Sequence, residues 1–124
     1  MSDRTGSCLC GQVTYCVTGP LRDVMLCHCS QCRKTSGHYV AATSCPEDAI
    51  KVTGKVTWYR SSDAAQRGFC GTCGGNLFWR PDGLGRMGIF AGTFDAPTGL
   101  RTSAQICTGD KSDYYSLPEV PVRD

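Results

Sequence analysis

Seven of the ten cysteines in this sequence of 124 residues fall in three short clusters, and their spacing constrains the fold more than any other feature. The middle cluster, Cys27-His28-Cys29-Ser30-Gln31-Cys32, holds three thiols within six residues. Thiolates at such spacings are typical ligands of Zn²⁺. The other two clusters are the pair Cys8 and Cys10 and the pair Cys70 and Cys73.

Ligand number predicts how these seven thiols are shared. A structural zinc site has four protein ligands, whereas a catalytic site keeps three and leaves one position open. The middle cluster is the natural open site, because its ligands come from one local loop. We therefore expect a closed site of Cys8, Cys10, Cys70 and Cys73, and an open site of Cys27, Cys29 and Cys32. Two four-ligand sites are the alternative, with the extra ligand supplied by Cys16, His28, His38, Cys45 or Cys107.

Composition indicates one domain of the turn-rich β class. Glycine is frequent at 15 residues, and only 19% of the residues are charged, which fits neither a helical bundle nor a disordered chain. No apolar run approaches the ~20 residues that span a membrane, and residues 1–6 contain no apolar signal segment. A reducing, cytoplasmic setting is therefore expected, where cysteines are metal ligands or buried thiols and not disulfides.

Charge gives no reason to expect a nucleic-acid partner. The formal net charge is +2 at pH 7. Ionising seven thiols and adding two Zn²⁺ would bring it to about −1, so no basic surface is implied.

Short alternating segments predict strands. Val13, Tyr15 and Val17 alternate with polar residues, which is the period of a half-buried strand. Residues 50–52 and 56–59 flank Thr53-Gly54-Lys55, a spacing that predicts a β-hairpin. We expect further strands over residues 38–44, 76–80, 87–94 and 103–107, and core positions for Trp58, Phe69, Phe78, Trp79 and Phe90.

Polar segments predict loops between these strands. Residues 30–37 are too polar for a core strand and predict a loop with at most a helical turn. Residues 61–65 predict a polar loop. The organisation expected is one domain over residues 6–115 followed by an extended surface tail over 116–124.

The three cysteine motifs, with their surroundings, resemble the glutathione-dependent formaldehyde-activating enzymes, a family that includes the centromere protein V domain. The resemblance covers roughly residues 6–115. Gln105-Ile106 stands where many members have His-Ile, and the chain is shorter than the characterised enzyme. The matching stretches are Gly6–Tyr15, Cys27–Gly37, Arg67–Leu77 and Ala91–Asp95.

This resemblance implies a β-tent fold with little or no helix and the same four-plus-three division of two zinc ions. It also implies a carbon–sulfur lyase reaction, the condensation of formaldehyde with glutathione to S-hydroxymethylglutathione. A small thiol would take the open position on the second zinc, and its sulfur would attack an aldehyde held nearby. The alternative is a zinc-stapled β module without chemistry that binds a partner.

Residues near the middle cluster are candidates for substrate binding. Arg33 and Lys34 could hold the carboxylates of glutathione, with a solvated loop pair as the alternative. Ser36 could shape the pocket floor, and a plain turn explains it equally well. His28 lies between two ligands, so alternation turns it away from the metal. Arg67, Arg80 and Arg86 are expected on the surface.

Overall fold

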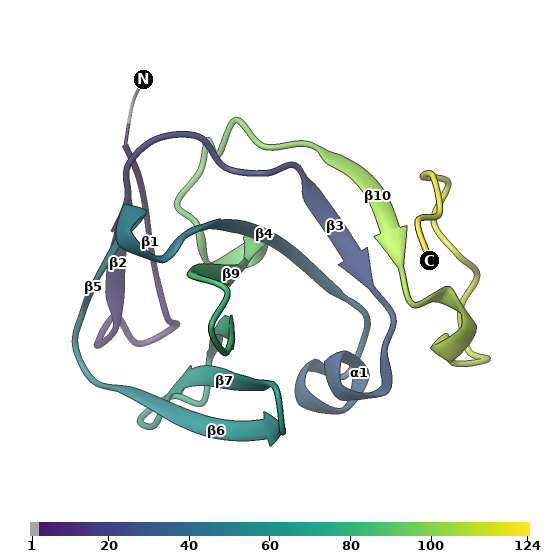
Figure 1. Cartoon of the computed structure of the whole chain (residues 1–124), viewed down its shortest axis with the longest axis horizontal. Helices are drawn as coiled ribbons and strands as arrows, with labels where there is room; N and C mark the ends of the chain where they lie inside the picture. The colour runs from purple at the N-terminus through teal and green to yellow at the C-terminus, as the bar shows by residue number, and fades with distance from the viewer. Residues whose placement is uncertain (1–2) are drawn as a thin grey trace.

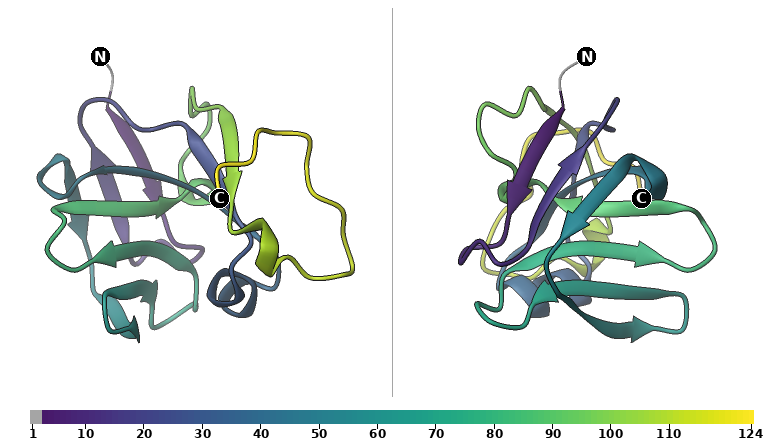
Figure 2. Two further views of the ribbon diagram at one scale, coloured as in Figure 1. Left: turned by 45° about the vertical axis from the view of Figure 1, so that its right-hand side comes forward. Right: turned by 90° about the vertical axis from the view of Figure 1, so that its left-hand side faces the viewer.

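Two β-sheets of unequal size build the protein, as Figures 1 and 2 show from three directions. The computed structural model describes residues 3–124. The small sheet has the strand order β1-β2-β5, and the large one β10-β3-β4-β9-β8-β7-β6. The strands are β1 Arg4–Ser7, β2 Thr14–Val17, β3 Val24–Cys27, β4 Val40–Pro46, β5 Ile50–Thr53, β6 Val56–Ser62, β7 Ala65–Cys70, β8 Asn76–Pro81, β9 Arg86–Phe90 and β10 Thr102–Ile106. The helices are α1 Ser30–Ser36 and the 3₁₀ turns Glu47–Ala49, Ala91–Thr93 and Thr108–Asp110.

The core lies between the two sheets, and the apolar positions of residues 13–17 face it, as their alternation with polar residues predicts. Val13, Tyr15 and Val17 are buried and pack against the large sheet. The ring of Tyr15 lies 5.5 Å from that of Phe78, edge to face. Burial of each such side chain stabilises the fold by roughly 1.5–3 kcal/mol. The predicted mainly β fold is confirmed.

The large sheet presents two different faces. On β9, Met87 and Ile89 point into the core, while Arg86 and Phe90 line a cavity on the opposite side. Side chains alternate between faces along a strand, so a strand that fills the core with one set of residues builds the cavity wall with the other. The sheet that completes the core therefore also forms the candidate site.

The predicted hairpin over residues 50–59 is wrong. β5 pairs with β2 in the small sheet, whereas β6 pairs with β7 in the large one. The segment 53–55 therefore carries the chain from one sheet to the other. Alternation predicts strands but does not identify their partners, and the separation of the two sheets decides the pairing.

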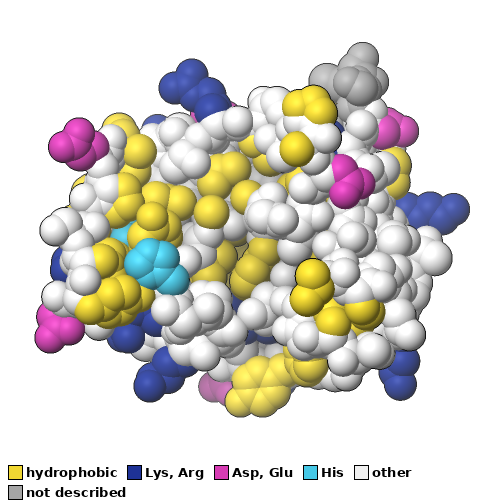
Figure 3. Space-filling view, turned by 180° about the vertical axis from the view of Figure 1, so that it is seen from behind, with side chains coloured by type: hydrophobic (Ala, Val, Ile, Leu, Met, Phe, Trp, Pro, Cys, Tyr) yellow, Lys and Arg dark blue, Asp and Glu magenta, His cyan; other side chains and the backbone are white. Residues whose placement is uncertain are grey.

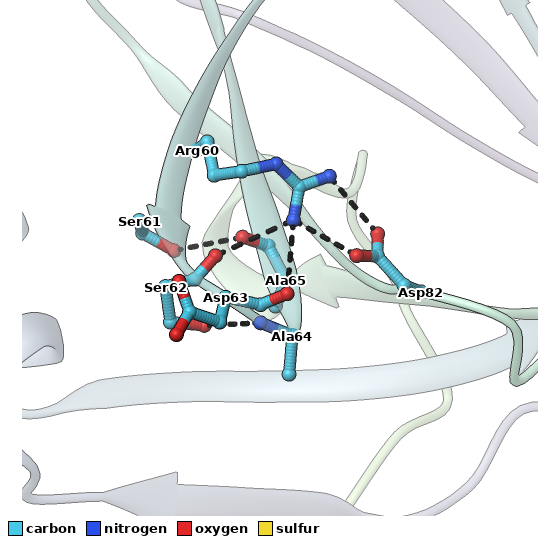
Figure 4. A network of polar contacts seen from close by, with 7 residues as sticks. All are labelled: Arg60, Ser61, Ser62, Asp63, Ala64, Ala65 and Asp82. Carbon is cyan, nitrogen blue, oxygen red and sulfur yellow. Dashed lines mark hydrogen bonds and ion pairs between the residues drawn. The ribbon is translucent and has the colours of Figure 1, made fainter.

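The polar loop predicted over residues 61–65 is also wrong, because strands occupy most of it. β6 continues to Ser62 and β7 begins at Ala65, which leaves a tight turn. Figure 4 shows Arg60 next to this turn, where it donates to the carbonyl oxygens of Ser62 and Asp63. Arg60 also pairs with Asp82 at 2.8 Å, and solvent screens an exposed pair of this kind, so it contributes little to stability.

Residues 30–36 form a complete helix, α1, and not a loop with at most one turn. The helix begins after Cys29, whose sulfur accepts a hydrogen bond from the backbone N–H of Cys32. It ends at Gly37, which has φ +88° and donates its N–H to the carbonyl of Arg33. Two caps stabilise a polar helix that has little apolar periodicity. None of the helices described within residues 3–124 has the length and hydropathy needed to cross a membrane.

The C-terminal tail returns alongside β10. The N–H of Gln105 donates to the carbonyl of Pro121, and the N–H of Arg123 donates to the carbonyl of Gln105. The tail is mostly exposed, but these backbone bonds attach it to the edge of the large sheet.

We predict that replacing Gly54 by alanine destabilises the protein far more than replacing Gly19. Both glycines have a positive φ, +99° and +88°, which costs an L-residue about 1–2 kcal/mol. A Cβ on Gly54 would also overlap the carbonyl oxygen of Gln12, whereas a Cβ on Gly19 meets nothing within 4 Å. Gly54→Ala is expected to cost about 3 kcal/mol or more in urea unfolding. Equal losses in the two variants would contradict this close approach.

Candidate metal centres

Four cysteine sulfurs from distant parts of the chain meet between the two sheets. Cys8 and Cys10 follow β1, Cys70 ends β7, and Cys73 lies in the turn before β8. The four sulfur atoms lie within 4.8 Å of one another, and the Cys8–Cys10 and Cys10–Cys70 separations are 3.7 Å. Tetrahedral metal–sulfur bonds of about 2.3 Å give sulfur–sulfur edges of about 3.8 Å. This four-cysteine cluster could therefore hold a metal ion.

Backbone donors already favour thiolates at this cluster. The N–H groups of Cys10 and Gly75 donate to Cys73, which lowers its pKa to about 6. The Gln12 N–H favours ionisation of Cys10, but desolvation and the thiols around it raise the pKa of Cys10 to about 11. Clustered thiols cannot all ionise unaided, because each thiolate repels the next. A bound cation would remove this conflict.

Three further sulfurs meet where β3 joins α1. Cys27 ends β3, Cys29 caps α1 and Cys32 lies in its first turn, so the local chain path brings them together. Their sulfur atoms also lie within 4.8 Å of one another. Within residues 3–124, no histidine, carboxylate or other cysteine completes this three-cysteine cluster as a fourth member. The cluster could hold a metal ion with one position left to a ligand.

Arg67 is buried beside this cluster, which corrects the expectation that it lies on the surface. Its side chain reaches from β7 to α1, where Nε donates to Gln31 at 3.3 Å and Nη2 lies 3.8 Å from the sulfur of Cys32. Only 8% of Arg67 is exposed. Hydrogen bonding from the thiol of Cys27 and, to a smaller extent, the guanidinium of Arg67 lower the pKa of Cys32 to about 5.

A cavity of about 530 Å³ opens onto the three-cysteine cluster. All three cysteines of the cluster line it, together with Trp79 and Phe90. The prediction that Trp79 and Phe90 lie in the core is wrong, whereas Phe78 is buried in the core as predicted. Neither histidine and no aspartate or glutamate of residues 3–124 lines the cavity. The arrangement can accept a ligand atom at the cluster and surround the rest of the ligand with mostly apolar walls.

His28 faces away from the cluster, as alternation predicts, and joins it to the tail. Nε2 lies 2.8 Å from Oε1 of Gln105, whose amide nitrogen donates to the carbonyls of Pro118 and Val120. The amide nitrogen of Gln105 is occupied by the two carbonyls, so its amide oxygen is the atom that faces His28. An amide oxygen can only accept, and His28 therefore carries its proton on Nε2 and donates it to Gln105. The Tyr115 hydroxyl then donates to Nδ1 at 2.7 Å. Gln105 and Tyr115 thus orient the loop that carries the cluster, a role that the sequence alone did not indicate.

His38 belongs to an exposed aromatic group at the same end of the molecule. Its ring packs against that of Tyr39 at a tilt, with the centroids 4.2 Å apart, and its Nδ1 lies 2.5 Å from the Tyr114 hydroxyl oxygen. Figure 3 shows histidine surrounded by hydrophobic side chains on this face. The group covers the tail-side surface of His28 through Tyr115 and does not line the cavity.

The predicted substrate-binding residues lie outside the main cavity. Arg33 donates to the carbonyl of Asp110, and Ser36 donates to the carbonyl of Cys32 within the helix. Lys34 lines a second, shallower pocket of about 240 Å³ that shares Gln31 and Arg67 with the main cavity. Of these three residues, only Lys34 lies next to space that a substrate could occupy.

The three remaining cysteines lie outside both clusters. Cys45 is completely buried in the core, as expected for a structural thiol. Cys16 lies half-buried on β2. Cys107 lines the cavity near Cys27 but is not a member of the three-cysteine cluster. No disulfide links the cysteines.

Fold and site together define a small β protein with one four-thiol and one three-thiol cluster, the latter open to a cavity. The family model of the glutathione-dependent formaldehyde-activating enzyme matches residues 3–110, and the chain belongs to this family. It is 30% identical over 119 residues to an uncharacterized lyase of Schizosaccharomyces pombe, covering 94% of this chain and 87% of that protein. A crystal structure of a Rhodobacter sphaeroides protein has a similar fold, with a TM-score of 0.61 and 23% identity over 80% of this chain and 99% of that one.

We predict that Cys10→Ser destabilises the metal-loaded protein about 2 kcal/mol more than Cys29→Ser. The four-cysteine cluster joins residues 60 positions apart, whereas the three-cysteine cluster closes a loop of a few residues. The difference in loop-closure entropy gives about 2 kcal/mol. The pair is matched, since neither side chain is buried and serine is itself a good helix cap at position 29. Urea unfolding with bound metal measures the difference, and equal losses would mean that the larger cluster does not act as a long-range cross-link.

Proposed function

We propose that this protein is a zinc-dependent enzyme of the carbon–sulfur lyase type that condenses a small thiol, glutathione, with an aldehyde. The observation that carries this proposal is the cavity, which opens onto a cluster of three thiols with no fourth member among residues 3–124. A non-catalytic zinc module needs only closed sites and no such cavity. The family description and the name of the yeast relative, a lyase, support the same reaction class.

Both clusters fit zinc by their donor set. Four sulfurs within 4.8 Å of one another, with two separations of 3.7 Å, fit a closed tetrahedral site of Cys8, Cys10, Cys70 and Cys73. We assign the open site to Cys27, Cys29 and Cys32. A zinc ion bound there supplies one free position at which a thiol is held in its thiolate form.

The residues around the open site have distinct roles in this proposal. Arg67 places a guanidinium against Cys32 and offsets the negative charge of a site with several thiolates. Gln31 holds Arg67 in position through its side-chain oxygen. Arg67 is buried, and the low dielectric around a buried group strengthens these contacts. Lys34 remains our candidate for a glutathione carboxylate through the neighbouring pocket.

The reaction needs no oxidant and releases no leaving group. The glutathione sulfur forms a bond to the aldehyde carbon, the carbon–oxygen double bond becomes a single bond, and the thiol proton ends on the oxygen. Neither histidine lines the cavity, so no histidine base is assigned. Free thiols throughout the chain fit the reducing cytoplasm that we propose as its setting.

We predict two bound zinc ions per chain and a cobalt-substituted protein whose visible spectrum shifts when glutathione is added. Cys29→Ser should weaken the response to glutathione at least tenfold, because one ligand of the open site is lost. Cys16→Ser is the matched control, since Cys16 lies outside both clusters. Thiols add to formaldehyde unaided, so activity must be measured as a rate above the uncatalysed reaction. Two metals with no response to glutathione would refute the thiol-binding site and favour the binding module.

We also predict that Arg67→Met shifts thiolate formation at Cys32 to higher pH in the metal-free protein. Among its hydrogen-bonding partners, Cys27 contributes most to the low pKa of about 5, and Arg67 contributes further. Removing the cation disfavours the thiolate, so the ultraviolet thiolate absorbance should rise at a higher pH than in the wild type. Arg101→Met is the control because Arg101 is exposed and does not line the cavity. An unchanged titration would contradict the contact.

A further inference from the structure

The cavity extends far beyond the three-cysteine cluster, along the outer face of the large sheet. Val40, Ala42 and Ser44 of β4 all line it. Val40 pairs with Cys27, while Ser44 pairs with Gly88 on β9. Four residues of extended strand correspond to about 13 Å. The cavity is therefore a groove with the reactive thiols at one end and the region of Ser44 at the other.

Two arginines occupy the far end of this groove. Arg86 donates from Nε to the Ser44 hydroxyl at 3.0 Å, and the backbone N–H of Arg22 donates to the Ser44 carbonyl at 3.2 Å. Both side chains line the cavity. Partial burial and the positive charge of Arg86 lower the pKa of Arg22, and the carboxylate of Asp23 partly offsets this effect.

Within residues 3–124 no carboxylate forms an ion pair with either arginine, although Asp23 lies near enough to Arg22 to favour its charged form. The arginines that form ion pairs within residues 3–124 are Arg60, Arg80 and Arg101. Neither Arg22 nor Arg86 has a carboxylate oxygen within 4.0 Å. Two unpaired guanidinium groups at the end of a groove attract an anion, and a carboxylate matches their geometry.

The walls between the two ends are mostly apolar. Trp79 and Leu84 line the groove and are 40% and 67% exposed, which leaves large hydrophobic surfaces without a cover. Formaldehyde has no apolar body that could fill this length. The peptide body of glutathione would find few hydrogen-bonding partners here. The apolar side chains on the walls include Met25, Val40, Ala42, Trp79, Leu84 and Phe90.

We propose that the aldehyde partner of the reaction carries a carboxylate on an apolar body, aromatic or aliphatic, and that Arg22 and Arg86 bind this carboxylate. This inference rests on the proposed function, since it names the aldehyde whose carbon the thiol attacks. The aldehyde carbon lies at the three-cysteine cluster, the apolar body lies along β4 and β9, and the carboxylate lies at the arginine pair. Atoms balance as in the parent reaction, because the carboxylate takes no part in bond making.

Binding is tested with unreactive analogues, which cannot form imines with lysines. The probes are 4-(hydroxymethyl)benzoate and benzyl alcohol, which differ by one carboxylate, and calorimetry on the zinc-loaded protein measures their affinities. The wild type should bind the benzoate about tenfold more tightly, which is the effect of one charge-assisted contact. Arg86→Gln should abolish this preference. Arg101→Gln should retain it, since it makes the same charge change outside the groove.

Kinetics then identify what occupies the arginine pair. With glutathione as the thiol, 4-carboxybenzaldehyde should have a KM about tenfold below that of benzaldehyde, and Arg86→Gln should remove the difference. Equal affinity for the two probes would overturn the proposal. A tenfold rise in the KM of glutathione with formaldehyde in Arg86→Gln would also overturn it, because the thiol would then be the ligand of the arginines. Failure of the proposed function has a different signature: no cobalt response to glutathione, with the preference between the probes intact.

Discussion

The rest of the structure depends on the meeting of four sulfurs between the two sheets. Cys10 and Cys70 are 60 positions apart, yet their sulfurs lie 3.7 Å from each other. A small domain buries a limited core, so a metal at this junction would supply cross-linking that packing alone provides weakly. The junction holds the small sheet against one face of the large sheet and leaves the other face free to form the groove.

The two clusters differ in how the chain brings their sulfurs together. In the four-cysteine cluster the cysteines come from segments far apart in the sequence, so their sulfurs meet only when the whole domain is folded. In the three-cysteine cluster, the end of β3, a helix cap and the first turn of α1 place the sulfurs within a few residues. A local site of this kind can keep its shape while its surroundings change, which suits a position that must accept and release a ligand. A long-range site suits permanent closure.

Cysteine spacing predicted both clusters, because ligand geometry is encoded in short motifs. Strand alternation predicted the strands but assigned β5 to the wrong partner, since periodicity carries no information on which strands pair. The helix α1 could have been recognised from its caps, Cys29 and Gly37. Arg67 could not be placed from its local sequence, because its burial depends on the contact that β7 makes with α1. The groove and its arginines likewise arise only when β4 and β9 lie side by side.

The tail contacts have a practical consequence for anyone who extends this chain. The carbonyls of Pro118 and Val120 accept from the side-chain amide of Gln105, whose oxygen contacts His28, the residue between Cys27 and Cys29. A polypeptide added after Asp124 would therefore begin close to the hydrogen bonds that orient the three-cysteine loop. A purification tag or fluorescent fusion placed there could displace the tail and break these hydrogen bonds. The strand β1 lies on the opposite side of the molecule (Figure 1), which makes the N-terminal side the safer point of attachment.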